Sequence, residues 1–141
     1  MDEKIRQAIF KQLEQEPFAK KFGLKLIDLR EGYAKVEMIF TQDMENMFGM
    51  AHGGAIFALI DAAFEVASNS HGTMAVALNM SINYLASPAK GSKLNAKAKE
   101  INKAKKTAAY NIFVTDDKNN PIAVCQALVY RMDKTLPFLG S

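Results

Sequence analysis

A long helical pattern in the middle of the chain constrains the fold most. Residues 53–70 place apolar side chains at helical spacing, and Gly53 and Gly54 stand at its start. At about 100° per residue, Asp61 and Glu65 fall on a narrow polar stripe opposite the apolar face. Alternating segments precede and follow this pattern. The chain is therefore expected to pack one long helix against a β-sheet.

The flanking segments complete an α+β layout. A helix is predicted over residues 3–15, because its apolar residues recur at helical spacing and Pro17 ends it. Strand patterns are separated by turn signals and cover residues 24–30, 33–41, 73–86, 92–102, 107–116 and 121–132. One long helix against a mostly antiparallel sheet is typical of the α+β class.

Length and composition fit a single domain spanning residues 1–141. The chain is 49% hydrophobic, which allows a sizeable core without covalent staples. No apolar stretch reaches the roughly 18 residues of a membrane span. The N-terminus is charged and lacks a signal segment. We therefore expect a cytoplasmic protein without a membrane partner.

Charge is balanced overall but uneven along the chain. A net charge of +3 does not indicate a nucleic-acid partner. Seven lysines lie between residues 90 and 106, where Glu100 is the only acidic residue. This concentration could hold a polyanionic ligand, or it could be a solvated strand face with a basic turn. Both interpretations remain open at this point.

Asn46, His52, Gly53 and Asp61 suggest acyl chemistry. A helix that starts at Gly53 offers free backbone N–H groups and the positive end of its dipole. Asp61, about two turns later, supplies a carboxylate that could attack a carbonyl or activate water. The alternative is that Asp61 lies on the wet face of an amphipathic helix and that His52 only packs at the junction before it.

Metal and cofactor sites are not indicated. His52, His71 and Cys125 have no spacing typical of metal ligands. The chain has no glycine-rich phosphate loop and no serine-nucleophile elbow. We therefore expect no metal and no cofactor.

The order of Asn46, His52-Gly53-Gly54 and Asp61 resembles the PaaI-like acyl-CoA thioesterases of the hotdog fold, known from phenylacetate degradation. The segment that ends at Tyr84 and continues into Ser87-Pro-Ala-Lys-Gly91 is also similar to that family. The similarity covers residues 23–132, the expected hotdog core. It implies a long central helix wrapped by a mostly antiparallel sheet. It also implies a homodimer with sites at the subunit interface, commonly paired into a homotetramer.

By this resemblance, Asp61 is the catalytic nucleophile or the general base for water. Asn46, His52 and the Gly53 amide would come largely from the other subunit. The Gly53 N–H would polarise the thioester carbonyl, which agrees with the physics of a helix N-terminus. Asn46 would hold the carbonyl or the attacking water, and His52 would orient the loop.

The substrate implied by the resemblance is an acyl-CoA. The residues expected nearest the thioester and acyl group are Gly54, Phe64, Glu65 and Met47. Methionines near the site suit an aryl or medium-chain acyl group, because their side chains adapt to irregular shapes. The residues expected to contact the CoA phosphates are Lys90, Lys105, Lys106 and Thr107.

Two positions depart from the family pattern. Ala77 stands where some relatives have a serine that helps to position water. Glu65 stands where other relatives have a small hydroxylated residue, one turn after the carboxylate. If both acids were buried, Glu65 would raise the pKa of Asp61; otherwise it is a solvated residue.

Three classes of function stay open. An acyl-CoA thioesterase that releases free acid and CoA is the first. A non-catalytic acyl-CoA-binding module is the main alternative, although binding alone does not require Asp61. A hotdog dehydratase or hydratase is the third, and would use a histidine with an acid in a different motif.

Overall fold

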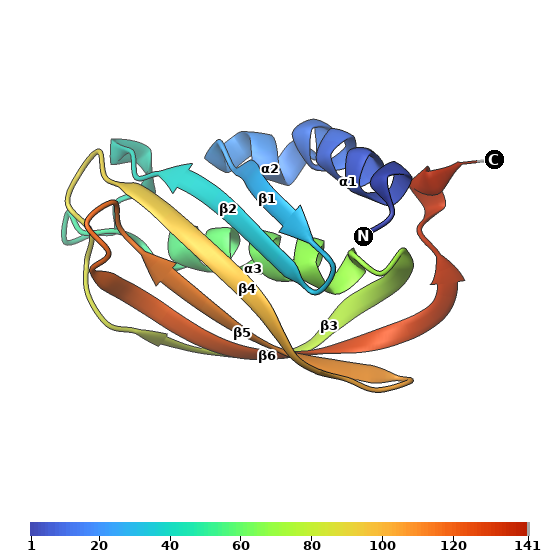
Figure 1. Cartoon of the computed structure of the whole chain (residues 1–141). Helices are drawn as coiled ribbons and strands as arrows, with labels where there is room; N and C mark the ends of the chain where they lie inside the picture. Colours follow the sequence, from blue (N-terminus) through green and yellow to red (C-terminus); the bar gives the residue numbers. More distant parts are fainter. Residues whose placement is uncertain (141) are drawn as a thin grey trace.

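The computed structural model describes residues 1–140 and shows a curved six-stranded sheet around a long helix (Figure 1). The strand order is β1-β2-β4-β5-β6-β3, and every neighbouring pair is antiparallel. The strands are β1 (Lys25–Arg30), β2 (Tyr33–Ile39), β3 (Thr73–Tyr84), β4 (Lys93–Lys103), β5 (Thr107–Thr115) and β6 (Pro121–Thr135). The helices are α1 (Glu3–Gln15), α2 (Pro17–Phe22) and α3 (Gly53–Asn69), with short 3-10 turns η1 (Gln42–Met44) and η2 (Pro137–Leu139). The predicted α+β layout is confirmed.

Helix α3 lies in the hollow of the curved sheet and forms the centre of the core (Figure 1). Eleven of its 17 residues are buried, which explains why its pattern is so strongly apolar. Phe64 packs edge-on against Tyr110 of β5, with 5.7 Å between ring centroids. Packing against the sheet therefore fixes the rotation of α3, and with it the direction in which Asp61 points.

Residues 17–22 form a short helix, α2, directly after the helix predicted over residues 3–15. Pro17 stands in the first turn of α2, where its missing N–H costs no hydrogen bond. Gly23 ends the helix in the left-handed conformation, with φ of +62°. Pro17 therefore begins this short helix, and Gly23 caps its end.

Strand β3 is a long open edge of the sheet. It has β6 on one side and no neighbouring strand among residues 1–140 on the other. Its side chains are unusually apolar for an edge, since Val76 is 45% exposed and Leu78 is 56% exposed. No helix within residues 1–140 is long and apolar enough to cross a membrane.

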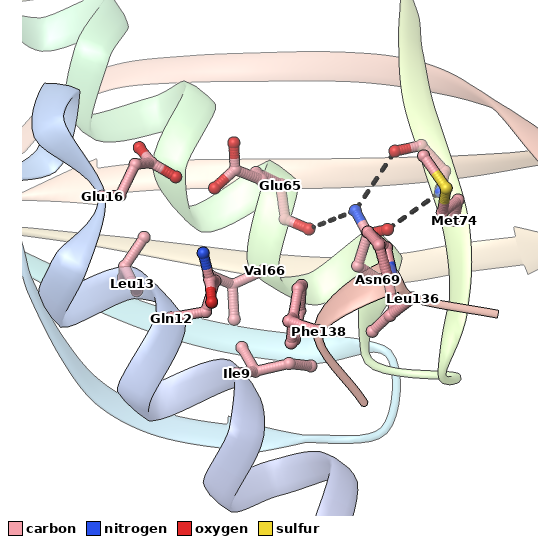
Figure 2. Close-up of a pocket in the computed structure, with 12 residues that line it drawn as sticks. Ile9, Gln12, Leu13, Glu16, Glu65, Val66, Asn69, Met74, Leu136 and Phe138 are labelled. Carbon is pink, nitrogen blue, oxygen red and sulfur yellow. Dashed lines mark hydrogen bonds between the residues drawn. The ribbon is translucent and has the colours of Figure 1, made fainter. Parts of the chain in front are cut away.

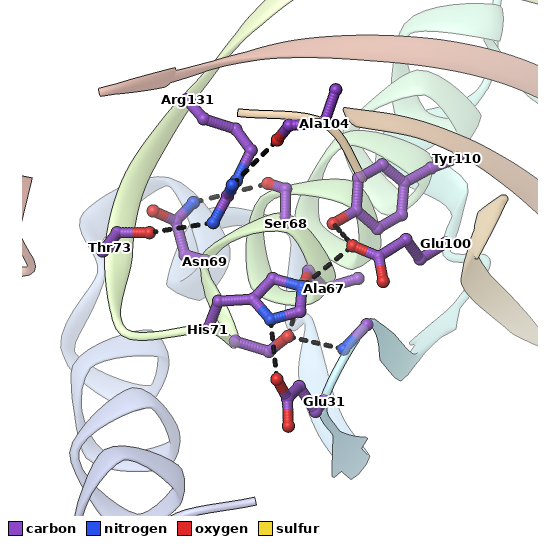
Figure 3. A network of polar contacts seen from close by, with 12 residues as sticks. Glu31, Ala67, Ser68, Asn69, His71, Thr73, Glu100, Ala104, Tyr110 and Arg131 are labelled. Atoms are coloured by element: carbon purple, nitrogen blue, oxygen red, sulfur yellow. Dashed lines mark hydrogen bonds and ion pairs between the residues drawn. The ribbon is translucent and has the colours of Figure 1, made fainter. Parts of the chain in front are cut away.

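The C-terminal end of α3 is fixed by a polar network around His71 (Figure 3). His71 Nδ1 lies 2.9 Å from Glu31 Oε1, and Nε2 lies 2.8 Å from Glu100 Oε1. The Tyr110 hydroxyl also donates to Glu100, over 3.1 Å. Both ring nitrogens of His71 therefore lie within hydrogen-bond distance of a carboxylate. The network therefore ties α3 to the β1–β2 turn and to β4.

Candidate functional site

The start of α3 leaves one backbone donor free. His52 is the N-cap, and its Nδ1 accepts the Gly54 N–H over 2.8 Å. The Gly53 N–H has no hydrogen-bond acceptor within residues 1–140. Because this donor stands at the positive end of the helix dipole, it suits a developing oxyanion. His52 therefore has a capping role, and the Gly54 N–H is occupied by its hydrogen bond to His52.

Tyr84, which the sequence did not indicate as a site residue, packs directly on Gly53. Its hydroxyl donates to the Gly53 carbonyl oxygen over 3.2 Å. A Cβ atom at Gly53 would lie 3.3 Å from the Tyr84 ring, so a side chain there would crowd the ring. Beside them is an open groove of about 380 Å³, lined by Met50, Ala51, Gly53, Ile56, Tyr84, Leu85, Ala86 and Ser87.

Asn46 shapes the loop before α3. Its Oδ1 accepts the backbone N–H groups of Phe48, over 2.9 Å, and Met50, over 3.1 Å. This turn does not use the Nδ2 donors of Asn46, which is the part of the side chain that could hold a carbonyl. Met47 projects outwards and is 90% exposed. Within one chain, Met47 therefore does not line a closed pocket.

Asp61 is half-buried on the open side of α3. Burial, followed by the charge of Glu16, raises its pKa above the ordinary value. Glu65 was expected to raise the pKa of Asp61 only if both acids were buried. Glu16 comes from the end of α1 and could not be placed from spacing along α3. Phe57, one turn before Asp61, is 40% exposed and was also missed. The signal for Phe57 was an aromatic residue on the polar side of an amphipathic helix.

Glu65 lies one turn beyond Asp61 and interacts with the same acid. Burial raises its pKa to about 8, with further increases from a hydrogen bond to Glu16 and from the charges of Glu16 and Asp61. Three carboxyl groups from two helices therefore share this region. By surface area Glu65 is exposed, which agrees with its interpretation as a solvated residue, and its proximity to Glu16 and Asp61 is what distinguishes it from other exposed acids.

Gly53 and Asp61 cannot act on one carbonyl from within a single chain. They are eight residues apart on one helix, which corresponds to a rise of about 12 Å. Reacting groups need to lie about 3–3.5 Å from the atom they act on. A site that uses both groups must therefore combine two copies of the chain.

Phe64 does not reach this region. Its side chain is 1% exposed and lies in the core against Tyr110. The expectation that Phe64 contacts the substrate is therefore corrected. Phe64 belongs to the apolar face of α3, as its helical position already indicated.

The predicted phosphate contacts do not form one surface on a single chain. Lys90 precedes β4, whereas Lys105 and Lys106 follow it, and the 11 residues of β4 span about 36 Å. Lys90 Nζ also lies 2.9 Å from Glu45 Oε1, beside the Asn46 loop. Lys90 therefore cannot share one compact phosphate site with Lys105 and Lys106 on a single chain.

Lys105 and Lys106 gain a third basic residue from β6. The Arg131 guanidinium donates to the Ala104 carbonyl over 2.9 Å, and its backbone N–H donates to the Lys106 carbonyl over 2.7 Å. A hollow of about 460 Å³ lies here, lined by Thr73, Lys105, Lys106, Tyr130, Arg131, Met132 and Asp133. Thr107, the next residue after Lys106, begins β5. Strand pairing, not sequence proximity, brings Arg131 to this turn.

Comparison with known proteins shows the same family throughout. Residues 48–123 match the model of the Thioesterase superfamily. The acyl-coenzyme A thioesterase PaaI of Escherichia coli K12 is 32% identical over 96% of this chain and 97% of its own length. The solved structure of E. coli PaaI superposes with a TM-score of 0.90 over 94% of this chain and 96% of that chain.

A Streptococcus mutans UA159 protein, solved bound to acetyl CoA, is 27% identical with a TM-score of 0.77. That match covers 80% of this chain and 91% of the S. mutans chain. The matches to PaaI extend over both the helical N-terminus and the sheet. The chain therefore belongs to the Thioesterase superfamily, as a PaaI-like thioester hydrolase with the hotdog fold.

Proposed function

We propose that this protein is an acyl-CoA thioesterase with Asp61 as its catalytic carboxylate. One observation carries the proposal: a half-buried carboxylate with a raised pKa lies on a helix whose first N–H is free. The substrate class is that of the PaaI relative and of the S. mutans protein bound to acetyl CoA. An aryl or medium-chain acyl group agrees with the apolar side chains around α3.

The reaction consumes one water and yields a carboxylic acid and the CoA thiol. In the general-base route, Asp61 takes a proton from water as its oxygen attacks the carbonyl carbon, and the C–S bond then breaks. The proton held by Asp61 passes to the departing thiolate. In the nucleophilic route, an Asp61 oxygen attacks the carbonyl carbon, the C–S bond breaks and the CoA thiolate leaves, which forms an anhydride between the acyl group and Asp61. Water then hydrolyses this anhydride to the free acid and the Asp61 carboxylate, and the proton released by water passes to the thiolate. The raised pKa makes the Asp61 carboxylate more basic, which supports its part in either route.

The Gly53 amide would stabilise the negative charge on the carbonyl oxygen in either route. Asn46 Nδ2 is the second candidate donor, since Oδ1 is engaged in the loop. His52 supports the site by capping α3 and holding Gly54 in place. These groups would come from the subunit opposite the one that supplies Asp61, because Gly53 and Asp61 of one chain are separated by a rise of about 12 Å along α3.

Two copies would meet along the β3 edge. Val76 and Leu78 expose apolar surface there, and a second β3 would satisfy the open backbone groups. We propose a homodimer on this edge, paired further into a dimer of dimers. For the CoA phosphates, we propose the turn that holds Lys105, Lys106 and Thr107, supported by Arg131. Lys90 lies at the opposite end of β4, next to the Asn46 loop, and would contact the CoA from there.

Thiol release from a panel of aryl- and fatty acyl-CoAs tests the proposal. Asp61→Asn should lower kcat at least about 100-fold, because it removes the base or nucleophile while keeping the shape of the side chain. Asp117→Asn, in the exposed turn before β6, is the matched control and should keep wild-type kcat. Thermal unfolding of both variants should show that the fold is retained.

The alternative of a non-catalytic acyl-CoA-binding module makes a different prediction. In that case calorimetry should detect tight binding of acyl-CoA, with no thiol release from any member of the panel. Unchanged kcat in Asp61→Asn would instead show a hydrolase in which another group performs the chemistry.

A further inference from the structure

A cavity of about 290 Å³ lies beside the carboxyl groups of Glu16 and Glu65 and extends towards the end of α3 (Figure 2). It is enclosed by α1, the second half of α3, the start of β3 and η2. Its apolar lining consists of Ile9, Leu13, Val66, Met74, Ala75, Leu136, Pro137 and Phe138. Its polar lining consists of Gln12, Glu16, Glu65 and Asn69.

Asn69 is a structural part of the cavity wall. Its Nδ2 donates to the Glu65 carbonyl, over 2.8 Å, and to the Ala75 carbonyl, over 3.2 Å. Its Oδ1 accepts the Ala75 N–H over 2.9 Å. These bonds join the end of α3 to β3 and occupy the amide. The side chains left to meet an occupant with polar atoms are therefore Gln12, Glu16 and Glu65.

The cavity begins one helical turn beyond Asp61, at Glu65. Glu65 is one turn beyond Asp61, about 6 Å along α3, and Asn69 is one further turn. Glu16 and Glu65 face each other at the end nearer Asp61, whereas Phe138 and Asn69 lie at the other end (Figure 2). A chain that starts from a carbonyl beside Asp61 would pass this carboxyl pair and then enter apolar surroundings. The distance from Asp61 to Asn69 allows an occupant of about 12 Å.

Resting on the proposed function, we propose that this cavity receives the acyl end of the thioester, and that Glu16 and Glu65 at its mouth exclude acyl groups with a second carboxylate. An apolar cavity of about 150 Å³ can hold benzene, and ligand pockets begin at about 300 Å³. The cavity is therefore large enough for a ring or a medium-length chain. Within the described chain, its lining includes no Lys, Arg or His, so a second carboxylate would be desolvated without a positive partner.

Thioether analogues of CoA test the cavity without requiring hydrolysis. We would measure by calorimetry the binding of ethyl-CoA, hexyl-CoA and ω-carboxypentyl-CoA to the full-length protein. Hexyl-CoA should bind at least about tenfold more tightly than ω-carboxypentyl-CoA of matched length. Equal affinity of these two analogues for the wild type would overturn the exclusion by Glu16 and Glu65.

Two variants assign the effect to the cavity. At pH 9, where a carboxyl group with a pKa of about 8 is ionised, Glu65→Gln should narrow the hexyl to carboxypentyl preference at least about threefold, because it removes one negative charge from the mouth. Phe138→Ala should lower the hexyl to ethyl affinity ratio by a similar factor, because it removes apolar wall from the far end. The matched controls are Glu14→Gln on α1 and Phe18→Ala on α2, which lie outside the lining and should leave both ratios unchanged.

Thiol release from the corresponding thioesters separates the two proposals. If the enzyme releases thiol but Phe138→Ala leaves its chain-length preference unchanged, the cavity assignment is overturned and the thioesterase proposal stands. Binding that responds to both variants, without turnover of any thioester, would overturn the thioesterase and leave the cavity as an acyl-binding pocket. If thermal unfolding shows that Phe138→Ala is unfolded, Phe138→Leu takes its place and should shift the ratio in the same direction.

Discussion

At the scale of single residues, His71 makes the stability of the fold depend on pH. A hydrogen bond from His71 and the charge of its ring lower the pKa of Glu31. A carboxyl group whose pKa is lowered by folding stabilises the native state above its unfolded pKa. That contribution is lost as pH falls through the lowered, folded value.

We therefore expect Glu31→Gln to lower the free energy of unfolding at neutral pH and to have no effect in strong acid. The loss should be at most about 1 kcal/mol, because Glu31 is exposed to solvent. Urea unfolding of the wild type and the variant between pH 7 and pH 3 measures it. Glu14→Gln, an exposed acid on α1, is the control. A loss of equal size at both ends of the range would contradict the linkage.

At the scale of elements, the N-terminus of α3 separates capping from chemistry. His52→Ala should destabilise the protein by about 0.5–2 kcal/mol, because the Gly54 N–H loses its acceptor. His52→Asn keeps a side-chain acceptor at the cap and should recover most of that stability. If His52 acts only by capping, it should recover thiol release as well. Thermal unfolding and kcat measured in parallel decide the point, and stable but inactive His52→Asn would assign chemistry to the imidazole.

Periodicity predicted most elements because each depends on its own residues. Helix α3, for example, was expected over residues 53–70 and runs from Gly53 to Asn69. The surroundings of Asp61 could not be predicted from periodicity. Glu16 lies 45 residues away along the chain and acts on Asp61 only because the fold brings the end of α1 close to α3. Lys90 and Lys106 show the opposite effect. They belong to one lysine-rich segment of the sequence, but the length of β4 separates them in the fold.

At the scale of the whole molecule, the open β3 edge determines the assembly. We expect gel filtration with light scattering to show at least a dimer. Leu78→Lys should shift the protein towards monomer, because a charge on this apolar edge opposes pairing. It should lower kcat together with the dimer fraction. Ile27→Lys on β1, the other edge of the sheet, is the control and should stay dimeric. A fully active Leu78→Lys monomer would contradict a site built from two copies.

The spacing between Gly53 and Asp61 along one rigid helix also has a consequence for mixtures of variants. One inactive chain can lack the carboxylate, as in Asp61→Asn, and another can lack the loop amide, as in Asn46→Ala. After unfolding and refolding together in equal amounts, half of the dimers would be hybrids, and each hybrid would combine both defects in one of its two sites and none in the other. Activity should therefore return to about a quarter of the wild-type level from two preparations that are each inactive.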